Sequence, residues 1–95
     1  MQADRQFVYV LECDGFVKIG IAKSVPKRMA GIQTGSPHDV EFLGMFPTIS
    51  PAEDEANLHR HYSEFRKRGE WFKLPQDKLD KLLRQACYHF RDFED

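Results

Sequence analysis

Two apolar runs near the start of the chain predict a β-hairpin. Residues 7–13 (FVYVLEC) and 16–22 (FVKIGIA) are rich in β-branched and aromatic side chains, which favour strands. Between them lies Asp14-Gly15, a dipeptide that favours a two-residue hairpin turn when apolar runs flank it. Such a turn places Tyr9 directly opposite Gly20 in the neighbouring strand.

Side chains alternate along a strand, so this register divides the hairpin between two faces of the sheet. One face carries Tyr9, Leu11, Lys18 and Gly20. The other face carries Val8, Val10, Val17, Ile19 and Ile21. Because both sets are largely apolar, we expect other elements to cover the sheet at least partly on both sides.

The next signals predict a short helix and a third strand. Ser24 is a favourable N-cap residue, Pro26 lies in the first turn that would follow, and Thr34-Gly35 is a suitable end. Residues 40–46 (VEFLGMF) form the next apolar run and predict a strand. This strand would complete a small sheet with the hairpin.

Two further helices are predicted in the second half of the chain. Residues 50–53 (SPAE) have the pattern of a capping box with proline at the first helical position, and this helix should reach about residue 67. Residues 70–74 (EWFKL) follow as an extended or irregular segment. After Pro75, apolar side chains at helical spacing predict a C-terminal helix over about residues 76–93. These side chains are Leu79, Leu82, Leu83, Ala86 and Phe90.

The predicted elements follow the order ββαβαα, and 95 residues are enough for a single domain. We therefore predict an α/β (α+β) fold over residues 1–95, with a three-stranded, at least partly antiparallel sheet flanked by helices. No apolar run approaches the ~20 residues that a membrane span needs, and the first residues lack a signal-peptide pattern. Cys13 and Cys87 show neither a disulfide framework nor a zinc-ligand spacing. We expect a reduced, cytoplasmic protein.

Charge is unevenly distributed, although the net charge of −1 argues against bulk attraction to nucleic acid. The stretch between Asp14 and Asp39 contains basic residues and no acidic one. These basic residues are Lys18, Lys23, Lys27 and Arg28. A second basic cluster consists of Arg66, Lys67 and Arg68. Each cluster alone is typical of a solvated surface, and the two gain functional meaning only if they flank one site.

Two charged residues interrupt apolar surfaces. Lys18 lies in the middle of the second strand, and Glu55 lies on the apolar face of the helix that follows Ser50, with His59 one turn further on. The apolar residues of that face are Ala52, Leu58, Tyr62 and Phe65. A buried carboxylate is costly unless it is paired, solvated in a cleft or bound to a metal. The simpler alternatives are a salt bridge for Glu55 and, for Lys18, an edge position from which the ammonium reaches water.

Four residues together match the needs of phosphodiester cleavage. That reaction requires a proton acceptor for water, cations for the developing charge and a carboxylate for a divalent metal. Tyr9 and Lys18 are diagonal neighbours on one face of the sheet. Arg28 lies one turn into the next helix, and Glu55 supplies the carboxylate. Taken singly, Tyr9 would also suit the core and Arg28 the surface.

The motifs, in their order along the chain, resemble those of the GIY-YIG nuclease superfamily. Residues 7–9 (FVY) retain the tyrosine of the first signature but not its glycine, and residues 18–20 (KIG) have lysine in place of the usual tyrosine. The chain is most similar to the small phage-type and meiotically up-regulated-gene branch. The motifs of that branch are present as Val17 to Gly20, Arg28, Thr34 to Pro37, Glu55 to His59 and Gly69 to Phe72. The resemblance covers about residues 7–74.

The resemblance implies a role for each matching residue. Tyr9 would take or relay the proton of the attacking water, and Lys18 would lower the pKa of Tyr9 or share the base role. Arg28 would brace the nonbridging phosphate oxygens with its bidentate guanidinium. Glu55 would hold one Mg²⁺ or Mn²⁺ ion. His59 would either support that ligand or serve in packing.

The function that the resemblance implies is that of a metal-dependent endonuclease acting on nucleic acid, with DNA favoured over RNA. Residues 70–72 (EWF) would close the core rather than touch the substrate. The residues predicted to bind nucleic acid are Lys23, Lys27, Arg66, Lys67 and Arg68. The net charge of −1 predicts weak, salt-dependent affinity, so a homodimer or a targeting partner is expected to contribute.

Two alternative functions use the same fold. One is a catalytically inactive module that binds nucleic acid through its basic residues. The other is a protein-interaction domain in which Tyr9, Lys18 and Glu55 form a buried network. In that case the loss of Glu55 should destabilise the fold by about 3–5 kcal/mol, as for a broken buried pair.

Overall fold

The predicted hairpin forms the centre of the sheet in this computed structural model. Strands β1 (Gln6–Cys13) and β2 (Phe16–Ala22) pair antiparallel, and Tyr9 lies opposite Gly20 as the sequence predicts. The turn residues Asp14 and Gly15 have φ angles of 54° and 84°. Positive φ at both central positions is the geometry for which tight hairpins select Asp-Gly.

The structure describes residues 5–85 and 88–89. Within them, β3 (Val40–Thr48) and three short strands complete a six-stranded sheet of order β4-β5-β2-β1-β3-β6. The short strands are β4 (Arg66–Arg68), β5 (Trp71–Phe72) and β6 (Tyr88–His89). Every described pair is antiparallel. The α+β class is confirmed, and the sheet has three strands more than predicted.

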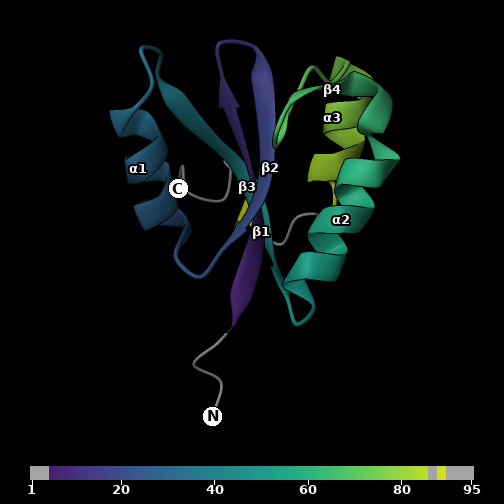
Figure 1. Ribbon diagram of the computed structural model, residues 1–95. Coiled ribbons are helices and arrows are strands. Elements are labelled where there is room, and N and C mark those ends of the chain that lie inside the picture. The colour runs from purple at the N-terminus through teal and green to yellow at the C-terminus, as the bar shows by residue number, and fades with distance from the viewer. Residues whose placement is uncertain (1–4, 86–87, 90–95) are drawn as a thin grey trace.

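Helices cover both faces of this sheet (Figure 1). Helix α1 (Val25–Thr34) lies on one side, and α2 (Pro51–His61) and α3 (Gln76–Leu83) lie on the other. The first helix begins as predicted, because the Ser24 hydroxyl accepts the backbone N–H of Lys27 at 3.4 Å. The predicted coverage of the hairpin on both sides is confirmed.

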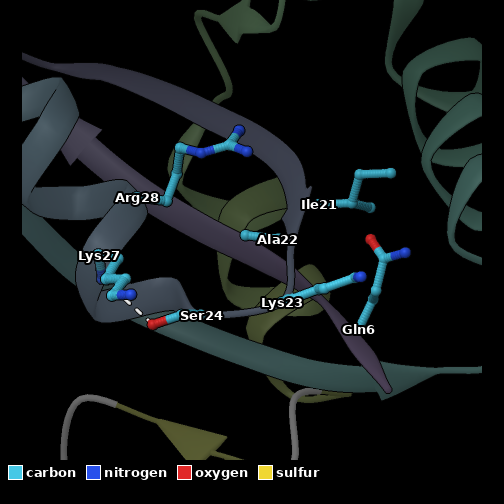
Figure 2. Close-up of a pocket in the computed structure, with 7 residues that line it drawn as sticks. All are labelled: Gln6, Ile21, Ala22, Lys23, Ser24, Lys27 and Arg28. Carbon is cyan, nitrogen blue, oxygen red and sulfur yellow. Dashed lines mark hydrogen bonds between the residues drawn. The ribbon is translucent and has the colours of Figure 1, made fainter. Parts of the chain in front are cut away.

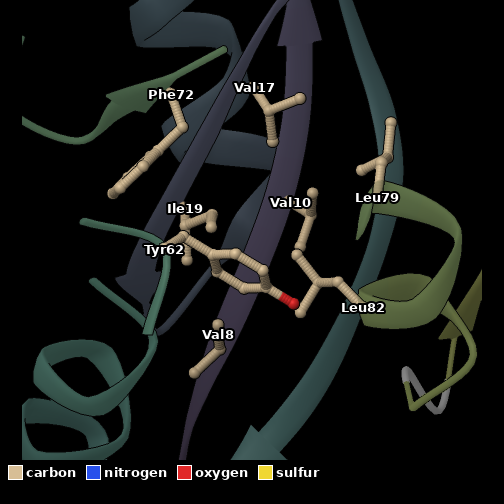
Figure 3. Close-up of a cluster of buried hydrophobic side chains, with 8 residues drawn as sticks. All are labelled: Val8, Val10, Val17, Ile19, Tyr62, Phe72, Leu79 and Leu82. Carbon is tan, nitrogen blue, oxygen red and sulfur yellow. The ribbon is translucent and has the colours of Figure 1, made fainter. Parts of the chain in front are cut away.

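Each face of the hairpin carries its own hydrophobic cluster, as the alternation of side chains predicts. The cluster beneath α2 and α3, called here the Phe72 cluster, is drawn in Figure 3. It consists of Val8, Val10, Val17, Ile19, Tyr62, Phe72, Leu79 and Leu82. The cluster on the opposite face consists of Tyr9, Leu11, Ala22, Val25 and Val40. The sheet therefore separates Tyr9 from the main core.

Helix α2 is shorter than predicted. It ends at His61 rather than near residue 67, and a 3₁₀ turn (Ser63–Phe65) leads into β4. The chain between residues 66 and 68 is extended because β4 pairs with β5 across a turn at Gly69. Pairing with β5, which is itself held against β2, has overridden the local helix signal in this segment.

The start of α2 is fixed by Thr48 rather than by the predicted capping box. Ser50 occupies the N-cap position, but its side chain makes no capping hydrogen bond. The Thr48 hydroxyl instead accepts the backbone N–H of Ser50 at 2.9 Å and donates to the carboxylate of Asp54. Ala52 is exposed, so the apolar face of this segment is narrower than expected and consists of Leu58, Tyr62 and Phe65.

Helix α3 also ends earlier than predicted. It stops at Leu83, and β6, at residues 88–89, lies opposite Gly44 and Met45 of β3. The edge of β3 carries backbone donors and acceptors that need partners, and β6 supplies some of them. Of the predicted apolar stripe, Leu79 and Leu82 are buried in the Phe72 cluster. Ala86 and Phe90 lie outside the described residues.

Candidate functional site

The edge of β2 next to Gly20 brings together the residues that the sequence analysis singles out. Strand β5 pairs with β2 only at Val17 and Lys18. Beyond that point, Ile19 donates its N–H to the Glu70 carbonyl at 3.1 Å and its own carbonyl accepts from His59 Nε2 at 2.8 Å. One residue of β2 thus anchors both the turn before β5 and helix α2.

Tyr9 reaches this edge by passing over Gly20. The tyrosine is 0% exposed, and its hydroxyl has no hydrogen-bond partner. A Cβ atom on Gly20 would lie 2.5 Å from Tyr9 Oη and 2.7 Å from Glu70 Oε1. Real Cβ atoms do not approach other atoms so closely, so only glycine leaves room for the phenol here. The Tyr9 hydroxyl and the Glu70 carboxylate therefore converge on one point.

The surroundings of Tyr9 keep its hydroxyl protonated at neutral pH. Burial raises the pKa of Tyr9 above its ordinary value, and the negative charge of Glu70 raises it further. Arg28 partly offsets this rise because the guanidinium interacts with the hydroxyl and favours the phenolate. The cation that lowers the pKa of Tyr9 is thus Arg28, whereas lowering this pKa was one of the two roles expected of Lys18.

Lys18 is held by Glu70 instead. Its ammonium lies 3.3 Å from Glu70 Oε1 and 5.1 Å from the centroid of the Trp71 ring. The Lys18 side chain is only 16% exposed, so it does not extend into water as the edge-strand alternative requires. The lysine in the apolar strand therefore has a specific carboxylate partner at the site.

Glu55 projects from α2 toward the same edge. Its Oε2 atom is buried and has no hydrogen-bond partner. Burial raises the pKa of Glu55, as do a hydrogen bond to Glu70 and repulsion by its charge, while His59 and Lys18 partly oppose the rise. No lysine or arginine in the described residues forms an ion pair with Glu55, so the salt-bridge alternative is not observed there. The carboxyl instead faces another carboxyl.

The donors present suit a hard divalent cation. Among residues 5–85, no group of three or more His, Cys, Asp and Glu side chains is arranged to hold a metal ion. Mg²⁺ commonly needs less, because one or two carboxylates bind it while waters and substrate phosphates complete the shell. The unpartnered Oε2 atom of Glu55 is a donor of this kind.

His59 supports the site from behind. Its Nε2 must donate to the Ile19 carbonyl, which can only accept, and its ring packs on Phe72 with centroids 5.1 Å apart. The histidine therefore ties the middle of α2 to β2 one helical turn from Glu55. This contact favours a role in packing and in positioning Glu55.

The two predicted basic groups lie toward opposite ends of β2. Lys23, Lys27 and Arg28 line a pocket of about 630 Å³ beside the β2–α1 connection (Figure 2). Lys67 and Arg68 line a separate pocket of about 340 Å³. The other residues of this second pocket are Cys13, Asp14, Phe16, His38 and Trp71. The Lys18–Gly20 segment lies between the two pockets along the strand.

Arg66, the remaining predicted basic residue, has a structural contact. Its Nε donates to the Gly69 carbonyl at 2.7 Å across the β4–β5 turn. Arg66 is exposed, as are Lys67 and Arg68. Its guanidinium is thus partly committed to holding the turn that carries Glu70.

A comparison of the sequence with models of protein families identifies the family of this chain. The model of the T5orf172 domain matches residues 6–87, most of the chain. The chain belongs to the T5orf172 domain family. This family is phage-associated and nuclease-like, which indicates a nucleic-acid-related function. Curated proteins and solved structures gave no match to the chain.

Sequence reasoning on this T5orf172 domain missed Glu70. The expectation was that residues 70–72 close the core, and this is correct for Phe72, which is 0% exposed. Glu70 instead reaches the site, with a side chain that is 35% exposed. An acidic residue directly before an apolar pair, after a glycine that can turn the chain, is the signal that could have identified it.

No helix in the described part of the chain is long and apolar enough to cross a membrane.

Proposed function

We propose that this T5orf172 domain is a metal-dependent endonuclease of the GIY-YIG type that hydrolyses phosphodiester bonds in DNA. The observation that carries the proposal is the pair of buried polar atoms without partners, Tyr9 Oη and Glu55 Oε2, beside one strand edge. Leaving a buried donor or acceptor unpaired costs about 1–3 kcal/mol. Two such atoms beside one strand edge, with Arg28 next to the Tyr9 hydroxyl, favour a site that is completed by substrate, water and metal.

Tyr9 and Arg28 act together on the attacking water and the phosphate. The raised pKa of Tyr9 means that it begins as a neutral phenol, so its hydroxyl relays the proton that water loses: it accepts that proton as its own proton passes on to solvent. The Arg28 guanidinium limits that rise and offers its planar fork to the nonbridging phosphate oxygens. The buried position of Tyr9 fixes the direction from which water is activated.

Glu55 and Lys18 organise the other side of the site. Glu55 would hold one Mg²⁺ or Mn²⁺ ion, and when bound such an ion stabilises the negative charge on a leaving oxygen. Lys18 holds Glu70 through an ion pair and adds positive charge to the edge of the strand. His59 keeps α2, and with it Glu55, against β2.

The two basic pockets suggest the path of the nucleic acid. Residues 16–22 span about 20 Å at a rise of about 3.3 Å per residue, which corresponds to about six base pairs. A duplex lying along β2 would reach the pocket of Lys23 and Lys27 at one end and that of Lys67 and Arg68 at the other. The net charge of −1 implies weak, salt-dependent binding, so a second copy or a targeting partner in the cytoplasm would supply further affinity.

The decisive experiment is nicking of supercoiled plasmid with Mg²⁺, with Mn²⁺ and with EDTA. Wild type should nick only with metal. Tyr9→Phe, Arg28→Ala and Glu55→Ala should each slow nicking by at least about 100-fold, the usual effect of losing a catalytic acid–base or charge-stabilising group. Melting temperatures should stay close to that of wild type.

Substitutions of the same residue types at positions away from the site serve as controls. Tyr62→Phe, Arg60→Ala and Glu64→Ala should nick like wild type. Salt-dependent DNA binding without cleavage under either metal would favour the inactive binding module. Unimpaired nicking by Glu55→Ala would rule out Glu55 as the metal ligand. A loss of about 3–5 kcal/mol in the free energy of unfolding of that variant would favour the protein-interaction domain with a buried network.

A further inference from the structure

Glu70 lies at the centre of the site. Its Oε1 atom is 3.3 Å from Lys18 Nζ and 2.7 Å from the position that a Cβ on Gly20 would take. The Tyr9 hydroxyl, on a side chain that is 0% exposed, lies 2.5 Å from that same position and has no partner. A buried hydroxyl and a carboxylate thus point at one spot without bonding to each other.

Two carboxylates meet at this spot. The carboxyl of Glu55, on α2, interacts with the carboxyl of Glu70. Glu55 nevertheless keeps its second oxygen buried and unpartnered. A cation between the two carboxylates would give this unpartnered oxygen a partner.

The backbone holds both carboxylates in place through a single peptide segment of β2. The N–H of Ile19 donates to the Glu70 carbonyl at 3.1 Å. The carbonyl of Ile19 accepts from His59, one helical turn from Glu55. Ile19 is 0% exposed, so this anchor is rigid and dry. The two side chains therefore converge because of the fold rather than by chance at a mobile surface.

We propose that Glu70 is a second carboxylate ligand of the divalent cation assigned to Glu55, and that Lys18 positions Glu70 for this role. The inference rests on the proposed function and extends it to residues that the single-ligand assignment leaves unused. Mg²⁺ and Mn²⁺ accept two carboxylates together with waters and phosphate oxygens. The 35% exposure of the Glu70 side chain gives the cation access from solvent. The ion pair with Lys18, whose ammonium is itself held over the Trp71 ring, keeps the carboxylate from turning away.

Metal binding to the DNA-free protein tests this assignment without depending on catalysis. Mn²⁺ is titrated into the full chain, and free Mn²⁺ is followed by electron paramagnetic resonance. Wild type should bind one ion. Glu55→Gln and Glu70→Gln should each weaken binding at least 10-fold, and the double variant should bind more weakly than either single variant. The exposed Glu41→Gln, on β3, is the matched control and should bind like wild type.

Two further variants separate a ligand from a structural residue. Glu70→Asp keeps the carboxylate and should recover part of the Mn²⁺ affinity that Glu70→Gln loses. Lys18→Met should weaken Mn²⁺ binding only a few-fold, because it removes the positioning ion pair but no ligand. Thermal melting in EDTA checks that each variant is folded, and addition of Mn²⁺ should raise the melting temperature of wild type but not of Glu70→Gln.

The outcomes distinguish this inference from the function on which it rests. Wild-type affinity for Mn²⁺ in Glu70→Gln, together with lost binding in Glu55→Gln, would overturn the role of Glu70 and leave the nuclease proposal intact. Equal weakening in Glu70→Asp and Glu70→Gln would also overturn it. Absence of metal-dependent nicking by wild type would remove the proposed function itself, whatever the Mn²⁺ titrations give.

Discussion

The Phe72 cluster and the edge of β2 at Gly20 are neighbours in the fold, but they differ in how many polar groups they bury and whether those groups have hydrogen-bond partners. In the cluster, the hydroxyl of Tyr62 is the one polar side-chain group among eight buried residues. At the edge, Tyr9 and Glu55 each keep a buried polar atom without a partner, and two carboxylates face each other. The first arrangement maximises stability, whereas the second gives up stability for atoms that can bind something else.

Phe72→Ala should have the largest effect on stability and would test the first half of this comparison. Phe72 is 0% exposed and packs in the centre of the cluster, so truncation leaves a cavity and should cost about 3–5 kcal/mol. Tyr9→Phe should cost less than about 1 kcal/mol because the hydroxyl it removes has no hydrogen bond. Denaturant unfolding measures both, and equal losses would show that the edge is as stabilising as the core.

Gly20→Ala should have an intermediate effect and connects the two regions. The new methyl group would collide with Tyr9 and Glu70, so either the phenol or the carboxylate must move. We expect a loss of about 1–3 kcal/mol, typical of overpacking, together with loss of plasmid nicking. Gly31→Ala, where a Cβ meets nothing within 4 Å, should leave nicking unchanged. Full nicking by Gly20→Ala would mean that the Tyr9 position is not critical.

Glu55→Gln should have a smaller effect on stability than Gly20→Ala, and of the opposite sign. In metal-free buffer at a pH above the raised pKa of Glu55, removing the charge should raise the free energy of unfolding by about 1 kcal/mol, at the low end of the cost of an unpaired buried group. Because the pKa of Glu55 is raised in the fold, the native state holds its proton longer than the unfolded chain does. Wild type should therefore lose stability as pH rises from about 4.5 through the raised pKa.

The difference in free energy of unfolding between Glu55→Gln and wild type should change over the same pH range. It should be absent in acid, grow as the carboxyl ionises and stay constant at higher pH. Chemical denaturation at a series of pH values from 4 upward, in EDTA, gives this profile. If Glu55→Gln is less stable than wild type at neutral pH, Glu55 stabilises the fold as the core residues do. The edge of β2 would then not differ from the Phe72 cluster in this respect.

Local patterns were sufficient to predict the centre of the fold. The Asp14-Gly15 turn fixed the register that pairs Tyr9 with Gly20, and the alternation of side chains assigned the apolar residues to two clusters. The Ser24 cap and the end of α1 were also predicted correctly. These features depend on contacts between residues close in sequence, so propensity and spacing describe them well.

Long-range pairing explains the errors. Residues 66–67 and 88–89 were predicted as helix. Residues 88–89 instead pair with β3, and residues 66–68 pair with β5, which is itself held against the distant strand β2. Strand propensity depends strongly on the neighbours that a strand acquires, and this dependence limits any local prediction. The same limit hid Glu70, whose role depends on where the β4–β5 turn places it against β2.

The sequence by itself determined which chemical groups are available: a tyrosine, a lysine, an arginine and glutamates in a recognisable order. It also determined that Lys18 and Glu55 interrupt apolar surfaces and so need an explanation. Only the tertiary structure decided that Lys18 pairs with Glu70, that Arg28 is the cation acting on Tyr9, and that Glu55 faces a second carboxylate. The physical reason is that charge interactions depend on distance and burial, and these are set where segments distant in sequence meet across one strand edge.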